Sequence, residues 1–255
     1  MRRAALLGGV AAVLVGCVGQ TKTMTVVTSA PSLTAAPSVV TTGSPVPGTV
    51  IAGVKRSVLP LSCDTPNDPV GTGFVGTGFR VRNGVVTASH VVAACPRGTT
   101  ISPGDGTGTV STDDPTRDLA RLTYQSPPFP KQSLNPDPKP LRLESRPAYV
   151  GELLALLGVP ALPLLGNPFT RQVTVVPGNV VATNRTQQLT SALGGREILK
   201  GAIEVAAPGV LPGESGGPAI DAAGKVVGVI EGGGPGVATL TPLADLTSCT
   251  DPQHC

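Results

Sequence analysis

Aromatic and charged residues are scarce in this sequence of 255 residues. Trp is absent, aromatic residues make up 2% and charged residues 14% of the chain, while 40% of it is hydrophobic. This balance excludes a highly charged disordered chain and a coiled coil. The net charge is only +3 and no dense basic block is present, so we do not expect nucleic acid as a partner.

Glycine and proline are abundant instead, with 33 Gly and 27 Pro, and they leave little room for long helices. Residues 79–82, the Asn83-Gly84 pair and residues 85–87 predict a hairpin. Further strand-like runs are 151–159, 173–183, 198–205, 219–220, 225–230 and 237–240, although 153–157 and 243–246 could also form short helices. Many short strands between turns predict an all-β sandwich or barrel.

The N-terminal segment has the pattern of a secretion signal. Two Arg residues precede an apolar run, residues 4–16, that is too short to span a bilayer, for which about 20 residues are needed. Its end, Leu14-Val15-Gly16-Cys17, resembles the lipobox of bacterial lipoproteins. That resemblance implies a signal peptide at 1–16, diacylglycerol on Cys17 and anchoring to the outer face of the bacterial cell membrane. An ordinary signal peptide with an incidental Cys is the alternative.

Residues 17–49 are dominated by Thr, Ser, Pro, Ala and Val, without an aromatic residue or sustained alternation. A segment of this kind cannot bury enough surface to offset its ordering entropy. We expect a tether that holds a folded domain, residues 50–255, away from the membrane.

The five Cys are an odd number, and removing Cys17 leaves four in a segment that would be exported. Three pairings of Cys63, Cys95, Cys249 and Cys255 are open. We favour Cys63–Cys95 and Cys249–Cys255, because the last two lie close together in the sequence. Zinc is the competing use of four Cys, but none of the spacings is C-x2-C, so no metal is expected.

The segment 211–218, Leu-Pro-Gly-Glu-Ser-Gly-Gly-Pro, places Ser215 among three glycines. Such a turn would present the hydroxyl beside backbone N–H groups that can face an oxyanion. Gly-rich turns with Ser are also common in all-β proteins, so this motif alone leaves a structural role open. The chain has only two His, however, and His90 lies where the run 85–87 ends. His is the side chain best suited to act as a general base near neutral pH.

Four segments together resemble the chymotrypsin-like (trypsin-fold) serine proteases, including the bacterial branch with the HtrA-type proteases. Residues 87–91, Thr-Ala-Ser-His-Val, resemble the family's histidine motif, and 118–122, Asp-Leu-Ala-Arg-Leu, its aspartate motif. Residues 213–218 resemble G-D-S-G-G-P, and 228–233 the strand that lines the primary pocket. The resemblance implies two six-stranded antiparallel β-barrels, residues 50–146 and 147–255, with the active site between them. Because only a short segment follows Ser215, we do not expect the PDZ module common in HtrA-type proteases.

Carried over residue by residue, the resemblance implies Ser215 as nucleophile, His90 as general base and then acid, and Asp118 as the carboxylate that orients His90. Backbone N–H groups of Gly213 and Ser215 would form the oxyanion hole. Acyl transfer would run through an acyl-enzyme, without metal or cofactor.

The carboxylate is the least defined of these residues, because Asp113 and Asp114 lie close to Asp118 and acidic residues on loops are usually just solvated. Asp118 directly precedes apolar residues, whereas Asp114 precedes Pro115 in turn-like company. We therefore prefer Asp118.

The resemblance also implies a substrate pocket, with Gly209 and Val210 near its base and Glu231, Gly232 and Gly233 along its wall. No acidic residue stands at the base, which disfavours cleavage after Lys or Arg and favours small or medium apolar side chains. Glu231 departs from the family, which usually has Ser there, near the catalytic Asp. We expect this second carboxylate to raise the pKa of its neighbours or to narrow the pocket.

Glu214 is another departure, since it replaces the Asp that pairs with a newly cut N-terminal amine in zymogen-activated members. An acylated N-terminus at the far end of a tether offers no such amine. We expect no activation step of this kind, and we expect Glu214 to find another partner or to face solvent.

The sequence thus predicts an exported, membrane-anchored serine endopeptidase that acts on protein or peptide substrates. Glu231 and Glu214 motivate one alternative, a catalytically silent binding or envelope lipoprotein with the same fold. An esterase is the other alternative, because residues 213–217 also match the Gly-x-Ser-x-Gly elbow of α/β-hydrolases. The α/β-hydrolase fold itself is disfavoured, since it needs a His after the Ser and only His254, next to the last residue, follows.

Overall fold

The computed structural model describes residues 45–64, 73–95, 100–103, 106–125, 139–161, 172–190, 196–234 and 236–243. The expected signal peptide, Cys17, most of the tether and the expected Cys249–Cys255 pair lie outside these ranges. Within these ranges, neither helix has the length and apolar character needed to cross a bilayer.

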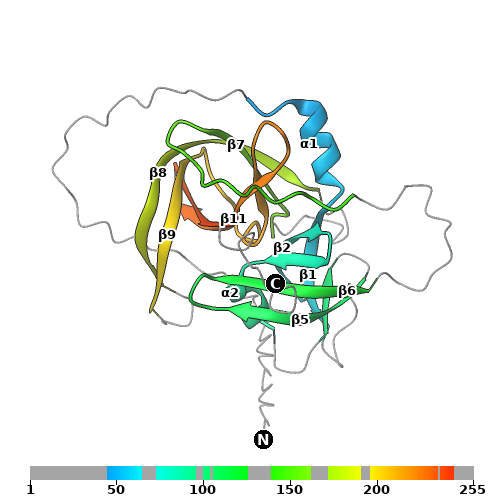
Figure 1. Ribbon diagram of the computed structural model, residues 1–255. Coiled ribbons are helices and arrows are strands. Elements are labelled where there is room, and N and C mark those ends of the chain that lie inside the picture. Colours follow the sequence, from blue (N-terminus) through cyan, green and yellow to red (C-terminus); the bar gives the residue numbers. More distant parts are fainter. Residues whose placement is uncertain are drawn as a thin grey trace, which may run out of the picture.

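The described residues form two closed antiparallel β-barrels of six strands each, one above the other in Figure 1. The first barrel consists of β1 (Val58–Asp64), β2 (Phe74–Val81), β3 (Gly84–Thr87), β4 (Thr100–Pro103), β5 (Thr107–Asp114) and β6 (Leu119–Gln125). The second consists of β7 (Leu153–Gly158), β8 (Thr174–Thr190), β9 (Arg196–Ala206), β10 (Pro218–Ile220), β11 (Val226–Gly234) and β12 (Val237–Pro242). Neighbouring strands follow the order β1-β2-β3-β6-β5-β4 in the first barrel and β10-β11-β12-β9-β8-β7 in the second. The all-β double barrel predicted from the sequence is confirmed.

The Asn83-Gly84 pair forms the turn of the predicted hairpin. β2 and β3 pair on either side of it, with Phe79 opposite Val86. Gly84 has a φ of 135°, and a Cβ atom there would lie 2.1 Å from the Leu122 backbone oxygen. Both the conformation and the lack of space therefore require Gly at this position.

β7 lies between two hydrophobic cores, which explains why its sequence is continuously apolar. Leu154 and Leu156 belong to the core of the second barrel. Ala155 and Leu157 belong to a core that also contains residues of the first barrel, such as Phe79. A strand buried on both faces shows no alternation, so its sequence resembles that of a short buried helix.

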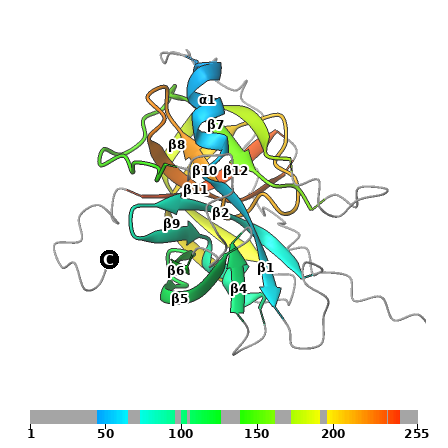
Figure 2. The same ribbon diagram turned by 90° about the vertical axis from the view of Figure 1, so that its right-hand side faces the viewer.

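The helix α1 (Gly48–Lys55) is not predicted by the sequence and begins two residues before the expected start of the domain. A Cβ atom on Gly224, in the turn between β10 and β11, would lie 2.8 Å from Val50 and 3.7 Å from Val54 of this helix. α1 therefore packs on the second barrel while the chain continues into β1 of the first (Figures 1 and 2). It is short and carries a glycine near its middle, Gly53, which weakens the helical signal.

Candidate active site

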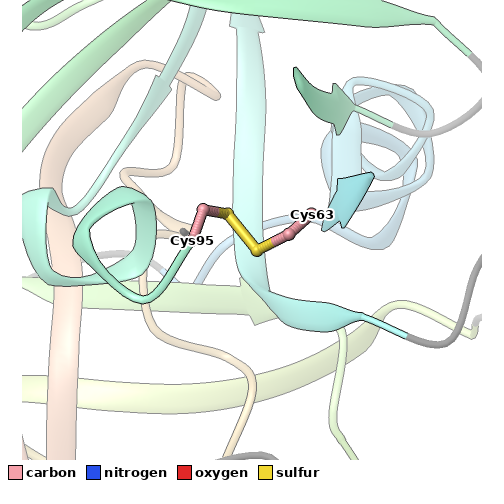
Figure 3. Close-up of a disulfide and its surroundings, with 2 residues drawn as sticks. All are labelled: Cys63 and Cys95. Atoms are coloured by element: carbon pink, nitrogen blue, oxygen red, sulfur yellow. A yellow bond between two sulfur atoms is a disulfide. The ribbon is translucent and has the colours of Figure 1, made fainter. Parts of the chain in front are cut away.

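His90 lies on α2 (Ser89–Ala93), a short helix that begins two residues after β3. Two residues after the end of the helix, Cys95 forms a disulfide with Cys63 of β1, and the two Cα atoms are 5.5 Å apart (Figure 3). This is the pairing favoured from the sequence. The disulfide ties the segment that carries His90 to the wall of the first barrel.

Asp118 ends the turn between β5 and β6 and binds His90 through both carboxylate oxygens. The ring nitrogen Nδ1 of His90 lies 2.6 Å from Oδ2, and the backbone N–H of His90 donates to Oδ1 at 2.7 Å. Asp118 has a φ of 51°, a left-handed conformation that Asp tolerates better than most residues. When Nδ1–H donates to Asp118, Nε2 of the ring becomes the acceptor nitrogen.

The two other candidate carboxylates have different partners. Asp113 accepts a hydrogen bond from the Ser89 hydroxyl at 2.5 Å. Asp114 accepts from the backbone N–H and the hydroxyl of Thr116, at 3.1 and 2.6 Å. The structure therefore brings Asp118 to His90. Asp113 binds the first residue of α2, and Asp114 binds the turn before β6.

The Asp118 carboxyl group is held in its ionised form. Burial acts to raise its pKa, since the residue is only 2% exposed. Hydrogen bonds from the side chains of Glu231 and His90, the charge of His90 and its backbone N–H outweigh burial. They hold the pKa of Asp118 well below its ordinary value.

Ser215 lies in the turn before β10, and hydrogen bonds fasten this turn to the first barrel. The backbone N–H of Thr77 donates to the Ser215 carbonyl oxygen at 2.8 Å, and the Thr77 hydroxyl donates to the Gly213 carbonyl oxygen at 2.7 Å. Gly216 has a φ of 86°, and a Cβ atom there would lie 2.1 Å from the Thr77 carbonyl oxygen. Only Gly at position 216 therefore allows the two barrels to meet this closely.

The Ser215 hydroxyl donates to the backbone carbonyl oxygen of Glu231 at 2.8 Å, so its hydrogen is directed at β11 and not at His90. Among the residues that the structure describes, the backbone N–H groups of Gly213 and Ser215 have no acceptor. Two such N–H groups on one turn form a site at which an oxyanion can bind.

Glu231 lies at a bulge of β11, where the pairing with β12 shifts register between Ile230 and Gly232. Its side chain is completely buried, with Oε2 3.7 Å from Nδ1 of His90, and a carboxyl oxygen of Glu231 lies within 4.8 Å of one of Asp118. Hydrogen bonding from the Glu231 side chain is among the causes that lower the pKa of Asp118. The expected rise in the pKa of neighbouring groups is therefore wrong for Asp118, because a hydrogen bond to the charged form of an acid stabilises that form.

Glu214 is buried and finds its partners within the second barrel. Oε2 accepts the backbone N–H of Leu211 at 2.8 Å, and the hydroxyl of Thr174 on β8 donates to Oε1. A Cβ atom on Gly158 would lie 2.5 Å from the Glu214 Cβ, which shows how closely this side chain is enclosed. Of the two outcomes expected for Glu214, the structure shows another partner rather than exposure to solvent.

The remaining pocket candidates, Gly209, Val210, Gly232 and Gly233, carry no polar side chain. Val210 packs against the core of the second barrel. A Cβ atom on Gly233 would lie 3.3 Å from the Val210 Cβ and 2.6 Å from the Val237 backbone oxygen. The surface formed by Val210 and Gly233 is therefore apolar and closely packed.

The side-chain ligand atoms of His90, Asp118 and Glu231 lie within 4.8 Å of one another, a separation that also suits a metal ion. The short hydrogen bond between His90 and Asp118 occupies the atoms that such an ion would need. We therefore assign no metal to this cluster.

Three Thr hydroxyls position the site, although the sequence gives no signal for this role. Besides the Thr77 bond to Gly213, the Thr87 hydroxyl donates to the Thr77 carbonyl oxygen at 2.7 Å. The Thr241 hydroxyl of β12 donates to the Arg117 carbonyl oxygen at 2.9 Å, directly before Asp118. The Thr77 and Thr241 bonds join different barrels, and Thr is common in strands for its β-propensity alone.

The matches with known proteins agree with this geometry. Residues 71–229 match the trypsin-like peptidase domain. The active form of the Rv3671c protease from M. tuberculosis is 26% identical at a TM-score of 0.59, with 82% of this chain and 87% of that chain covered. The fold of the HtrA-type protease AlgW with a decapeptide is similar at a TM-score of 0.54 and 21% identity, covering 76% of this chain and 62% of that one.

A sequence relative, the uncharacterized protein y4bJ of Sinorhizobium fredii, is 29% identical over 214 residues, or 78% of this chain. The chain spans only 30% of the length of that relative. The domain match covers more than half of the chain, spans most of the strands of both barrels and includes the His90, Asp118 and Ser215 segments. The chain belongs to the trypsin-like peptidase family.

Proposed function

We propose that this chain is a serine endopeptidase that uses Ser215, His90 and Asp118. The observation that carries the proposal is the two-point attachment of His90 to Asp118, at 2.6 and 2.7 Å, beside a Gly-rich turn that presents Ser215 and two free N–H groups. An orienting carboxylate, a base and an oxyanion site around one hydroxyl are the groups needed for acyl transfer.

In this mechanism the Ser215 oxygen attacks the carbonyl carbon of the peptide while Nε2 of His90 takes the hydroxyl proton. The N–H groups of Gly213 and Ser215 bind the carbonyl oxygen as it becomes negative. The C–N bond then breaks, and the leaving amine takes the proton from His90. Water hydrolyses the acyl-enzyme by the same steps, and Asp118 stabilises the His90 imidazolium each time it forms.

The hydroxyl of Ser215 must turn before it can react, because it donates to the Glu231 carbonyl oxygen. Rotation of one side-chain torsion between staggered positions redirects it, and hydrogen bonds of catalytic groups are often poorly aligned without substrate. The same observation favours the second candidate, a silent binding protein in which the hydroxyl stays on β11.

Labelling with a fluorophosphonate probe separates the two candidates. We expect covalent labelling of the intact, folded protein at Ser215. Ser215→Ala should abolish it, and His90→Ala should reduce the labelling rate by about a factor of 10³ or more, since the hydroxyl then lacks its base. No adduct on folded wild-type protein, under conditions where a control protease reacts, would favour the silent protein.

For the substrate, we propose peptide bonds that follow a small or medium apolar side chain. The packing of Val210 against the position of Gly233 supports a shallow apolar pocket. Cleavage of a peptide library, compared with Ser215→Ala, identifies the preference. Val210→Ala should shift the substrate preference toward larger side chains. The ratio of kcat/KM values should change roughly 10-fold or more for each added methylene group. A parallel panel of esters tests the esterase alternative, which requires fast ester and negligible peptide cleavage.

Attachment to the membrane through acylated Cys17 is a further part of the proposal. It is supported by the Leu14-Val15-Gly16-Cys17 motif at the end of a short apolar run. We expect wild-type protein expressed in bacteria to partition with membranes and Cys17→Ala protein to be released. Full membrane partitioning of the Cys17→Ala protein would show that lipidation is not the anchor.

A further inference from the structure

Two buried carboxyl groups, those of Glu231 and Asp118, lie near the Nδ1 atom of the His90 ring. The Glu231 side chain is 0% exposed, that of Asp118 3% and that of His90 13%. The Glu231 Oε2 lies 3.7 Å from the nitrogen, Nδ1, that is 2.6 Å from the Asp118 Oδ2. Glu231 thus adjoins the His90–Asp118 hydrogen bond.

The described elements around this pair contribute few charged groups. Of the described elements around it, α2 contributes the His90 ring, and the turn before β6 contributes Asp118 itself. Arg117 in that turn is 47% exposed and pairs with Asp114 instead. The nearby turn before β10 carries the carboxyl group of Glu214, which is bound to Leu211 and Thr174.

Thr241 of β12 adds a neutral hydroxyl, which donates its hydrogen bond to the Arg117 carbonyl oxygen. Two carboxylates that share one buried site repel each other, and each ionised group is costly to bury. When two carboxyl groups share such a site, one of them keeps its proton. Asp118 accepts both the ring and the backbone N–H of His90, so the charge belongs on Asp118.

We propose that Glu231 is held as a neutral carboxylic acid that donates its hydrogen bond to the Asp118 carboxylate. The site then contains a continuous chain, Glu231–Asp118–His90, next to Ser215. Glu231 is a positioning residue: it fixes the carboxylate that orients His90 and touches no substrate. The lowered pKa of Asp118 agrees with this arrangement, since the Glu231 hydrogen bond is one of its causes. The catalytic consequence rests on the proposed peptidase function, whereas the protonation state does not.

The arrangement makes the folded state pH-dependent. Above the pH at which an ordinary Glu ionises, about 4.3, the unfolded chain releases the Glu231 proton while the folded chain keeps it. The folded state then binds one proton more than the unfolded state. Rising pH therefore weakens folding, by up to a factor of ten in the unfolding equilibrium constant for each pH unit, until Glu231 itself ionises.

The test compares urea unfolding of wild type and Glu231→Gln from pH 4 to pH 8. Gln has nearly the same shape and keeps an N–H donor toward Asp118, but it cannot ionise. We expect the ratio of the unfolding constants, wild type over Glu231→Gln, to rise with pH by up to tenfold per unit above about pH 4.3. A ratio that is constant between pH 5 and pH 8 would overturn the proposal, because it means that Glu231 ionises as it does in the unfolded chain.

Glu144→Gln is the matched control, at a buried carboxyl group beside the start of β11, where the Glu144 N–H donates to the Val226 carbonyl oxygen. Glu144 is also buried, but it pairs with the Lys225 ammonium at 3.2 Å. Burial acts to raise its pKa, yet the Lys225 and backbone hydrogen bonds prevail and lower it. The folded state therefore holds this proton less tightly than the unfolded state does. The ratio for Glu144→Gln should change only as the pH falls toward and below about 4.3, and should be flat from pH 5 to pH 8.

Two further measurements complete the test. The infrared difference between wild type and Glu231→Gln at pH 7 should contain the band of a protonated carboxyl group; its absence would also overturn the proposal. In the fluorophosphonate assay, Glu231→Ala should react at least tenfold more slowly than Glu231→Gln, because only Gln still donates to Asp118. Equal rates would remove the positioning role. If wild type is not labelled at all, the peptidase proposal fails, while the unfolding and infrared data still decide the protonation of Glu231.

Discussion

The hydroxyl of Thr77 in the first barrel donates a hydrogen bond to the carbonyl oxygen of Gly213 in the second, at 2.7 Å. The same hydroxyl accepts the backbone N–H of Val159 at 2.9 Å, and Thr77 is completely buried. This contact fixes the peptide unit between Gly213 and Glu214, which lies between the two N–H groups proposed for the oxyanion site. This side chain thus contributes both to the docking of the two barrels and to the shape of the site.

Thr77→Val should damage both stability and activity. The substitution keeps the shape of the side chain but leaves the Val159 N–H and the Gly213 carbonyl without their partner. Each unsatisfied buried group costs about 1–3 kcal/mol of unfolding free energy. Urea unfolding measures this loss, and the fluorophosphonate labelling rate of Ser215 measures the effect on the site.

Thr77→Ser is the control, since it keeps the hydroxyl and loses only a methyl group. It should retain most of the stability and nearly the wild-type labelling rate. If the Val and Ser variants behave alike, packing of the methyl group and not the hydrogen bonds holds the turn.

Asp118→Asn should lower the rate of peptide cleavage by about 10⁴, the size of the effect when the orienting carboxylate of such a triad is replaced. Asn cannot stabilise the imidazolium, and its amide group favours the wrong ring tautomer of His90. The measured quantity is kcat on a peptide selected from the library, with the KM determined alongside to separate binding from chemistry. A loss of less than tenfold would show that Asp118 is not the orienting residue.

The same substitution has a defined pH dependence in stability, best measured in a Glu231→Gln background so that Asp118 is the one carboxyl group of the pair that titrates. The folded-state pKa of Asp118 is lowered, so its contribution is complete well above the unfolded value of about 3.9. It is lost as the pH falls from about 3.9 toward the folded pKa. The comparison is between the Glu231→Gln variant and the variant that carries both Glu231→Gln and Asp118→Asn. The difference in their unfolding free energies should be constant above about pH 5 and shrink below about pH 4. A difference that grows on acidification would contradict the lowered pKa.

Glu214→Ala should loosen the turn that carries Ser215. The Leu211 N–H loses its acceptor, which costs about 1–3 kcal/mol if the group remains unsatisfied. The Thr174 hydroxyl also loses Glu214 but can still donate to the Gly158 carbonyl oxygen at 3.1 Å. The labelling rate of Ser215 should fall as well, because the turn also presents the N–H groups of the oxyanion site. Glu214→Gln is the matched variant: its amide oxygen still accepts the Leu211 N–H, so it should retain more of both properties. Wild-type stability and labelling in Glu214→Ala would show that the turn holds its shape without this side chain.

Local patterns predict the parts of the fold that depend on neighbouring residues. Asn83-Gly84 predicts a hairpin because only a few residues adopt the backbone conformation of that turn, and the structure has the turn there. The residues 153–157 leave strand and helix open, because β7 is buried on both faces and alternation is lost. The helix α1 is missed for a different reason: packing against the Gly224 turn stabilises it, and this contact joins segments far apart in the sequence.

The candidate site divides in the same way. The motifs single out His90 and Ser215, and the apolar residues after Asp118 distinguish it from Asp113 and Asp114. The effect of Glu231 is not predictable from the sequence, because a bulge in β11 turns the side chain toward Asp118, and the direction of the pKa change depends on that hydrogen bond. The Thr77 and Thr241 contacts depend on the docking of the two barrels and have no local signature.

Removal of the disulfide between Cys63 and Cys95 should lower stability and slow the proposed reaction. The bond joins residues 32 apart in the chain, and closing a loop of this length in the unfolded state contributes roughly 3 to 4 kcal/mol. Cys95 lies two residues after the end of α2, so its release also frees the helix that positions His90. Replacing both Cys by Ala should therefore reduce the unfolding free energy by that amount and lower the labelling rate of Ser215. A reducing agent should produce the same two losses in wild type and neither in the double Ala variant; if the double variant is also sensitive, the reductant acts at another position.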